Sequence, residues 1–375
     1  MASKRIGFFH MDEIHHINHF ISVAVELSKT NQVSILTYPN QHTYLFNCLS
    51  KFKDHNITVV QLRTHWFRAL TDKLKNRDLP RKGFWMKKNK RFLLTHFDAL
   101  VFTDYFHHKL LKARGNKINP KFLKVPHGAP GRDYSYNKDQ LDFDFQLLFG
   151  HFHYQQFKEK NLLGPHPVII GYPKIDAVSL NEKKSFFNNN KPVVLYNPHF
   201  SPPHSSWHGM GLEILEFFYQ QKEYNLIFAP HINLFKDKGS ESASQIPEKY
   251  FKANHIFIDL GSEESVEMTY LKAASLFLGE VSSQVYEFII NPRPCIFINV
   301  QKVAFKDDAN FRFWKLGQVI EEVNELNDAL QNAFSGFEKY KPIHEKITAE
   351  NFYQEKNTTA SQRAAIAINE YLEKA

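Results

Sequence analysis

Two adjacent serines stand where the chain could hold a phosphate. Ser282 and Ser283 follow the apolar run 276–278 and precede a segment, 284–290, whose apolar residues fall on one helical face. This pattern predicts a buried parallel strand, a turn and a helix. Serine hydroxyls, free backbone N–H groups and the helix dipole would all favour an anion there. The alternative is an ordinary strand–helix unit in which the serines only cap the helix.

Two histidines directly follow predicted strands. His127 comes after the strand predicted over 122–125, and His231 follows the strand predicted over 225–229. A neutral imidazole at His127 could take a proton from a hydroxyl, because its pKa lies near the working pH. His231 could donate to phosphoryl oxygens and stabilise developing charge. Each could instead form only a polar end to its strand or turn.

Three acidic side chains are further candidates. Glu287 lies one helical turn after Ser283, where it could hold ribose hydroxyls or remain an exposed helix acid. Asp12 and Glu13 follow the first predicted strand, at the sheet edge where doubly wound domains bind ligands, and could orient or deprotonate an acceptor.

His15 and His19 have the i, i+4 spacing of metal ligands. No HExxH pattern or cysteine partner supports them, so no metal is predicted.

Alternating strands and helices must position these residues. A polar break at 181–191 interrupts the alternation, which then restarts. We therefore predict an α/β chain with a Rossmann-like domain over 1–180, a second over 192–341, and a ligand cleft between them. A helical tail over 342–375 is expected to cross back onto the first domain. The predicted strands of the first domain are 5–9, 33–37, 57–61, 99–103, 122–125, 146–149 and 168–170.

Composition excludes several other classes of protein. The 375 residues suit two domains, and 43% hydrophobic with 23% charged residues is typical of a globular chain. Cys48 and Cys295 are far apart in sequence, which argues against a disulfide framework. We expect no signal peptide and no membrane-spanning segment, because no apolar run has the length of either signal. A cytoplasmic protein is expected, with peripheral contact at the inner face of the cell membrane.

The net charge of +8 is unevenly distributed. From Lys73 to Arg91 the sequence has nine basic residues and a single acid, Asp78, with the apolar residues 84–86 in the middle. This segment suits an anionic membrane surface or a polyanionic acceptor, or is simply a solvated loop and helix face. No nucleic-acid-binding motif appears, so nucleic acid is not an expected partner.

Five short motifs occur in an order that resembles the CDP-glycerol glycerophosphotransferases, the enzymes that prime and polymerise teichoic acids. The resemblance covers roughly residues 123–299. The motifs are VPHG at 125–128, GYPKID at 171–176, VLYNPH at 194–199, FAPH at 228–231, and the stretch 270–287 that contains Glu280, Ser282 and Ser283.

This resemblance implies a GT-B fold of two Rossmann-like domains, with the donor bound mainly by the second. It implies no metal and no cofactor other than the donor, CDP-glycerol or another cytidine-activated compound. His127 would be catalytic and Gly128 would lie beside the donor. His199, Glu280, Ser282 and Ser283 would contact the donor. Two departures concern the donor end: Glu280 replaces an aspartate, and residues 197–200 replace a Trp-Arg segment.

We therefore expect a transferase that moves a glycerol-phosphate or related group to a hydroxyl of a cell-surface glycan or its lipid-linked precursor. Three alternatives remain open. The chain could be a GT-B glycosyltransferase that uses a nucleotide sugar such as CMP-Kdo. It could be a sugar-nucleotide 2-epimerase, or a non-catalytic adaptor that docks on membranes.

Overall fold

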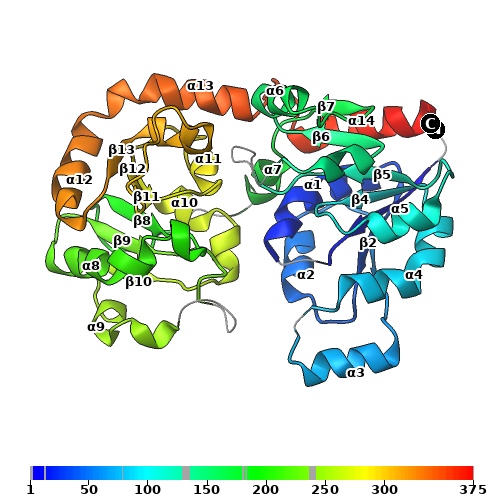
Figure 1. Ribbon diagram of the computed structural model, residues 1–375, viewed down its shortest axis with the longest axis horizontal. Helices are drawn as coiled ribbons and strands as arrows, with labels where there is room; N and C mark the ends of the chain where they lie inside the picture. The colour runs from blue at the N-terminus through cyan, green and yellow to red at the C-terminus, as the bar shows by residue number, and fades with distance from the viewer. Residues whose placement is uncertain are drawn as a thin grey trace. The chain divides into compact units, whose positions relative to one another are not determined.

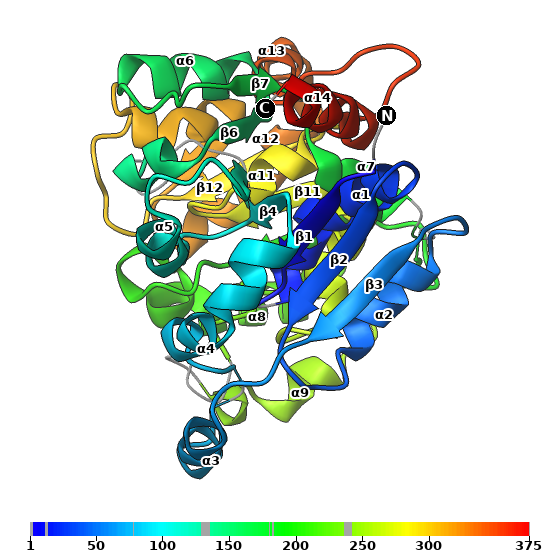
Figure 2. The same cartoon turned by 90° about the vertical axis from the view of Figure 1, so that its right-hand side faces the viewer.

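The computed structural model describes residues 3–11, 14–77, 79–128, 136–179, 181, 184–235 and 242–374. By their contacts these residues form two α/β units (Figures 1 and 2). The first contains the described residues up to 179 together with 350–374, and the second contains those from 181 to 349.

The first unit is built on a parallel sheet of seven strands in the order β3-β2-β1-β4-β5-β6-β7. The order reverses between β1 and β4, which is where open α/β sheets bind ligands. The strands are β1 Arg5–Phe9, β2 Gln32–Thr37, β3 Ile57–Gln61, β4 Ala99–Phe102, β5 Lys121–Lys124, β6 Phe145–Leu148 and β7 Pro167–Ile169. These strands match the predicted ones to within a residue or so at their ends.

Side chains alternate along a strand, so both faces of this sheet carry apolar side chains. Helices cover both faces. Phe8 stacks on Phe20 of α1, whereas its neighbour Phe9 packs against Trp85 of α4. The helices are α1 Ile17–Ser28, α2 Thr43–Ser50, α3 Trp66–Leu74, α4 Lys82–His96, α5 His108–Arg114, α6 His151–Glu159, α7 Pro173–Ser179 and α14 Ala360–Lys374. The short 3-10 helices are η1 Ile14–His16 and η3 Lys138–Asp142.

The second unit has a six-stranded parallel sheet in the order β10-β9-β8-β11-β12-β13, with its reversal between β8 and β11. The strands are β8 Val193–Asn197, β9 Asn225–Phe228, β10 Ile256–Ile258, β11 Leu276–Gly279, β12 Cys295–Ile298 and β13 Gln318–Ile320. The helices are α8 Trp207–Gln220, α9 Glu248–Phe251, α10 Thr269–Ala273, α11 Gln284–Phe288, α12 Leu326–Ser335 and α13 Lys341–Asn351. The 3-10 helices are η4 Pro202–His204, η5 Ala243–Gln245, η6 Glu263–Val266, η7 Ala309–Leu316, η8 Val323–Glu325 and η9 Phe337–Lys339.

Two expectations differ from the structure. The helix predicted after the serines is only the five residues of α11, because the chain leaves it at Ile289 for the proline-containing turn before β12. The tail is divided between the units. His344 of α13 is buried and its Nε2 lies 2.6 Å from the carbonyl oxygen of Leu316 in the second unit. Only residues 350–374 join the first unit.

α14 is fixed in the first unit by the GYPKID turn. The Asp176 carboxylate accepts from the backbone N–H of Ser361 (2.7 Å) and from its hydroxyl (2.6 Å). Gly171 has φ +92°, and a Cβ there would lie 2.4 Å from the carbonyl oxygen of Tyr353. This motif therefore needs its glycine and its aspartate to hold the returning tail.

Candidate functional site

His127 lies just beyond β5, at the carboxyl edge of the first sheet. Its Nδ1 is 2.6 Å from the backbone carbonyl oxygen of Thr103. A carbonyl oxygen can only accept, so Nδ1 carries the proton and Nε2 of the neutral ring keeps its lone pair. This is the tautomer that a general base needs in order to take a proton from a hydroxyl.

The surroundings of His127 keep its ring neutral. Burial and the neighbouring Lys124 lower the pKa of His127 below its usual value. The ring of His16 stacks on it with centroids 4.2 Å apart, and burial together with His127 also lowers the pKa of His16. Both imidazoles at this end of the sheet are therefore neutral near pH 7.

Lys124 is a buried lysine at the end of β5. Its ammonium donates to the Thr103 carbonyl oxygen at 2.6 Å, the same oxygen that orients His127. Burial lowers the pKa of Lys124 to about 7. The charge of Lys124 therefore changes in the pH range in which His127 would act.

Of the other predicted site residues of this unit, the structure describes Gly128 but not Asp12 or Glu13. Gly128 has φ +78°, a conformation that favours glycine, directly after His127. Asp12 and Glu13 lie outside the described residues. Within the described chain, one group of three side chains has metal-ligand geometry, His107, His108 and Asp142, and His15 and His19 are not part of it.

In the second unit, Glu280 follows β11 and is buried. Its two carboxylate oxygens accept from the backbone N–H groups of His199 (2.9 Å) and Ser206 (2.6 Å). Burial raises the pKa of Glu280 to about 7, against the opposing effect of these hydrogen bonds. Glu280 therefore holds the loop from His199 to Ser206 through two backbone N–H groups.

His199 and His231 come from neighbouring strands, β8 and β9, and their ring centroids are 6.0 Å apart. In each ring Nδ1 accepts a backbone N–H, from Ser201 (3.0 Å) and from Asn233 (3.2 Å) respectively. The proton of each neutral ring is therefore on Nε2. Both side chains are set to donate, which is the property required to hold phosphoryl oxygens.

The serines lie in the segment that follows β11 and leads into α11. The Ser282 hydroxyl accepts from the backbone N–H of Gln284 (3.2 Å), so it closes a local turn. Ser283 is the N-cap residue of α11 without a side-chain cap bond. Glu287 of α11 is buried, so the alternative of an exposed helix acid is wrong.

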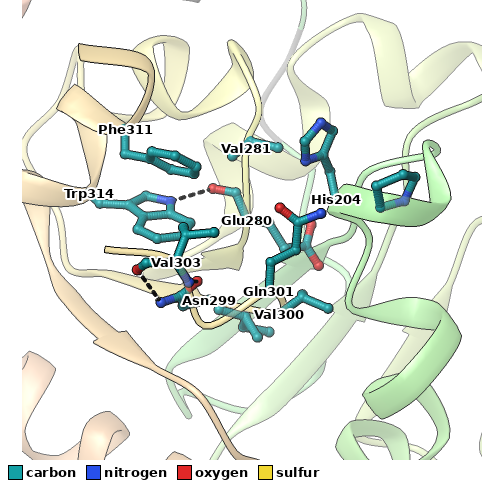
Figure 3. Close-up of a pocket in the computed structure, with 11 residues that line it drawn as sticks. His204, Glu280, Val281, Asn299, Val300, Gln301, Val303, Phe311 and Trp314 are labelled. Carbon is teal, nitrogen blue, oxygen red and sulfur yellow. Dashed lines mark hydrogen bonds between the residues drawn. The ribbon is translucent and has the colours of Figure 1, made fainter. Parts of the chain in front are cut away.

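Figure 3 shows one small hollow beside Glu280. His204, Asn299, Gln301 and Trp314 line it, and the Trp314 indole N–H donates to the Glu280 carbonyl oxygen at 2.8 Å. The second small hollow is lined by Asn197, Ser265, Tyr270, Gln284 and apolar neighbours. Glu280 contributes to the first hollow and Gln284 to the second, so each lies beside an end of the serine-containing segment.

Residues 61–370 match the family described as CDP-glycerol:poly(glycerophosphate) glycerophosphotransferase. The chain belongs to this family. Its members are enzymes, so the adaptor alternative is set aside in favour of a transferase. No curated protein matches the chain by sequence.

Several solved structures have a fold similar to that of this chain. The wall teichoic acid polymerase TagF is 13% identical, with TM-score 0.60 over 100% of this chain and 90% of that one. UDP-GlcNAc 2-epimerase from Neisseria meningitidis, bound to UDP-GlcNAc, is 13% identical, with TM-score 0.60 over 100% of both chains. UGT73P12 of Glycyrrhiza uralensis is 11% identical, with TM-score 0.65 over 100% and 96%. The predicted α/β, GT-B fold is thereby confirmed.

Sequence reasoning missed some residues around His127. Lys124 and Thr103 lie in or directly after predicted strands, and we gave them no role. A signal was present for Lys124, because a lysine inside an otherwise apolar strand is rarely buried without a specific reason. Thr103 acts through its backbone carbonyl oxygen, which no side-chain pattern reveals.

Within the described chain, no helix is both long and apolar enough to cross a membrane.

Proposed function

We propose that this family member transfers glycerol phosphate from CDP-glycerol to a hydroxyl of a poly(glycerophosphate) chain or its lipid-linked precursor. The observation that carries the proposal is the opposite hydrogen bonding of the histidines. Nε2 of His127 is an acceptor, whereas Nε2 of His199 and of His231 is a donor. One base and a pair of anion-binding donors are the groups that such a transfer needs.

In this reaction the acceptor hydroxyl gives its proton to Nε2 of His127. Its oxygen attacks the phosphorus that bears the glycerol, a P–O bond forms there, and the P–O bond to CMP breaks. His199 and His231 donate to the phosphoryl oxygens as negative charge shifts to the departing CMP. Glu280 holds the His199 loop through two backbone N–H groups, and Ser282, Ser283 and Glu287 remain proposed donor contacts. His127 belongs to the first unit, and the proposed donor contacts belong to the second.

The decisive experiment is the release of CMP from CDP-glycerol in the presence of a glycerol-phosphate acceptor. CDP-ribitol, CMP-Kdo and UDP-GlcNAc serve as competing donors. We expect acceptor-dependent CMP release with CDP-glycerol and little turnover of UDP-GlcNAc. Conversion of UDP-GlcNAc to its 2-epimer, without CMP release from CDP-glycerol, would overturn the proposal in favour of the epimerase alternative.

We further propose that the enzyme works on an anionic membrane surface through the basic segment from Lys73 to Arg91. The structure changes which residues could do so. Trp85 and Met86 are buried, and the Trp85 indole N–H donates to the carbonyl oxygen of Leu62 at 2.6 Å. The exposed cations of α4 are Lys87, Lys88, Lys90 and Arg91.

Replacing these four residues by Gln should weaken binding to anionic vesicles. Raised salt should weaken the wild type in the same way, because screening acts over roughly 10 Å at ordinary ionic strength. Unchanged vesicle binding in the variant would show that the segment is only a solvated face.

A further inference from the structure

The helix α3 turns its apolar side toward solvent. Trp66 is 79% exposed, Leu70 53% and Leu74 75%, and Phe67 beside them is 43% exposed. At 100° per residue these four side chains fall within an arc of about 100° on one side of the helix. In Figures 1 and 2 the helix projects from the rest of the first unit.

The polar side of α3 faces the protein instead. Asp72 is buried, and its Oδ1 lies 2.7 Å from Nε of Arg81. The Thr71 hydroxyl accepts from Nη2 of Arg81 at 2.8 Å. The guanidinium of Arg68 lies 4.0 Å from the ring centroid of Phe84. These contacts fix the rotation of the helix, so its apolar side is held outward by specific polar interactions.

The charged residues beside the apolar side of α3 indicate what kind of surface this side binds. Lys73, Lys75 and Arg77 lie at the end of α3 and directly after it, and all three are exposed. Asp72, the acid of this helix, is turned inward. A narrow apolar strip with a tryptophan, bordered by cations, is complementary to the headgroup boundary of an anionic bilayer. A protein partner with both acidic and basic residues on its surface would not require cations alone beside the apolar side of α3.

We propose that α3 inserts Trp66, Phe67, Leu70 and Leu74 into the headgroup–acyl boundary of an anionic lipid bilayer. The inference rests on the proposed membrane association and adds an apolar component to the attraction by the basic residues. The charged component should disappear at high salt, whereas the apolar component should remain, because burial of apolar surface is not screened.

Intrinsic tryptophan fluorescence can test this directly. Trp85, Trp207 and Trp314 are at most 5% exposed, so Trp66 is the one tryptophan whose surroundings would change on binding. With vesicles of phosphatidylglycerol and phosphatidylcholine we expect a blue shift of the emission and quenching by lipids brominated in the acyl chain. The double variant Leu70→Gln, Leu74→Gln should bind these vesicles about tenfold more weakly or worse, since two apolar contacts are lost. Cooperative thermal unfolding of the variant confirms that it is folded.

The matched control is Ile118→Gln, because Ile118 is 67% exposed on the same unit but outside α3. It should bind vesicles as the wild type does. If vesicles bind but emission does not shift and brominated lipids do not quench it, insertion of α3 is overturned while membrane association stands. If vesicles do not bind at all, both are overturned. Dimers that dissociate in the double variant, without an effect of vesicles, would assign the strip to a second copy of the chain.

Discussion

At the scale of single residues, hydrogen bonds to the backbone decide what each histidine can do. A carbonyl oxygen at Nδ1 makes His127 an acceptor at Nε2, whereas backbone N–H groups at Nδ1 make His199 and His231 donors. The same side chain thus takes opposite roles in the two units. Burial keeps His127 neutral, which suits a base that must work near pH 7.

Removal of this base should affect the rate more than the binding of the donor. His127→Ala should lower kcat by about 10²–10⁴-fold, the usual contribution of a positioned base. The dissociation constant for CDP, measured by calorimetry, should change little, because His127 belongs to the first unit and the proposed donor site to the second. A variant with wild-type turnover would remove His127 from the mechanism.

Glu280 should make the free energy of unfolding of the protein depend on pH. Its pKa is raised from 4.5 to about 7, so between these values the folded state keeps a proton that the unfolded state has released. This group therefore lowers the free energy of unfolding as pH rises from about 5 to 7, by an amount on the order of 3 kcal/mol. In Glu280→Gln this part of the pH dependence should be absent.

Urea unfolding of both proteins at pH 5 and pH 7.5 measures this difference. If the free energy of unfolding changes with pH by the same amount in the wild type and in Glu280→Gln, the Glu280 carboxyl is ionised throughout. Its two backbone hydrogen bonds would then stabilise the ionised form.

At the scale of elements, the GYPKID motif at 171–176 positions α14, the last helix of the described chain. Asp176 in α7 accepts two hydrogen bonds from Ser361 at the start of α14, and the Ser361 hydroxyl also lies 2.8 Å from the Ser22 hydroxyl of α1. Arg363 adds hydrogen bonds to the carbonyl oxygens of Ile170 (2.8 Å) and Thr358 (2.7 Å). α1, α7 and α14 thereby form one packed layer of the first unit.

Asp176→Ala should weaken this layer. It leaves the backbone N–H of Ser361 without its acceptor, which should lower the free energy of unfolding by about 1–3 kcal/mol. Amide hydrogen exchange over 360–374 should accelerate more than exchange in β1. The control Asp307→Ala removes an exposed carboxylate of the second unit and should change neither quantity. Unaltered exchange in α14 would show that apolar packing alone holds it.

At the scale of the whole molecule, each unit carries a separable part of the proposed reaction. The second unit carries two imidazoles, two serines and a buried glutamate just after the carboxyl ends of β8, β9 and β11. The first unit carries the base, the basic segment and the outward apolar side of α3. Donor binding and membrane binding should therefore be measurable independently.

CDP should stabilise the protein by mass action, by about 2.7 kcal/mol at a concentration of 100 times Kd. Hydrogen exchange should slow over 197–206 and 280–290, where the donor contacts are proposed, and α3 should be unaffected. UDP and ATP are the comparison ligands. Protection by UDP or ATP alone would contradict the assignment of a cytidine donor.

The sequence by itself determined the elements and the ends of strands on which the candidate residues lie. Apolar runs, polar breaks and prolines act over a few neighbouring residues, so they located the strands β1 to β7, β9 and β11 and placed His127 and His231 at the carboxyl edges of sheets. The order of short motifs also predicted the family that residues 61–370 match.

Only the tertiary structure decided how these residues are oriented and which faces are exposed. The proton position on His127 depends on the Thr103 carbonyl oxygen, 24 residues away, and the anchoring of α14 joins residues 185 apart. The basic segment showed its charge in the sequence, yet whether Trp85 or Trp66 was exposed depended on the rotation of α3 and α4 in the fold. Such contacts form between residues distant in sequence, and local periodicity carries no information about them.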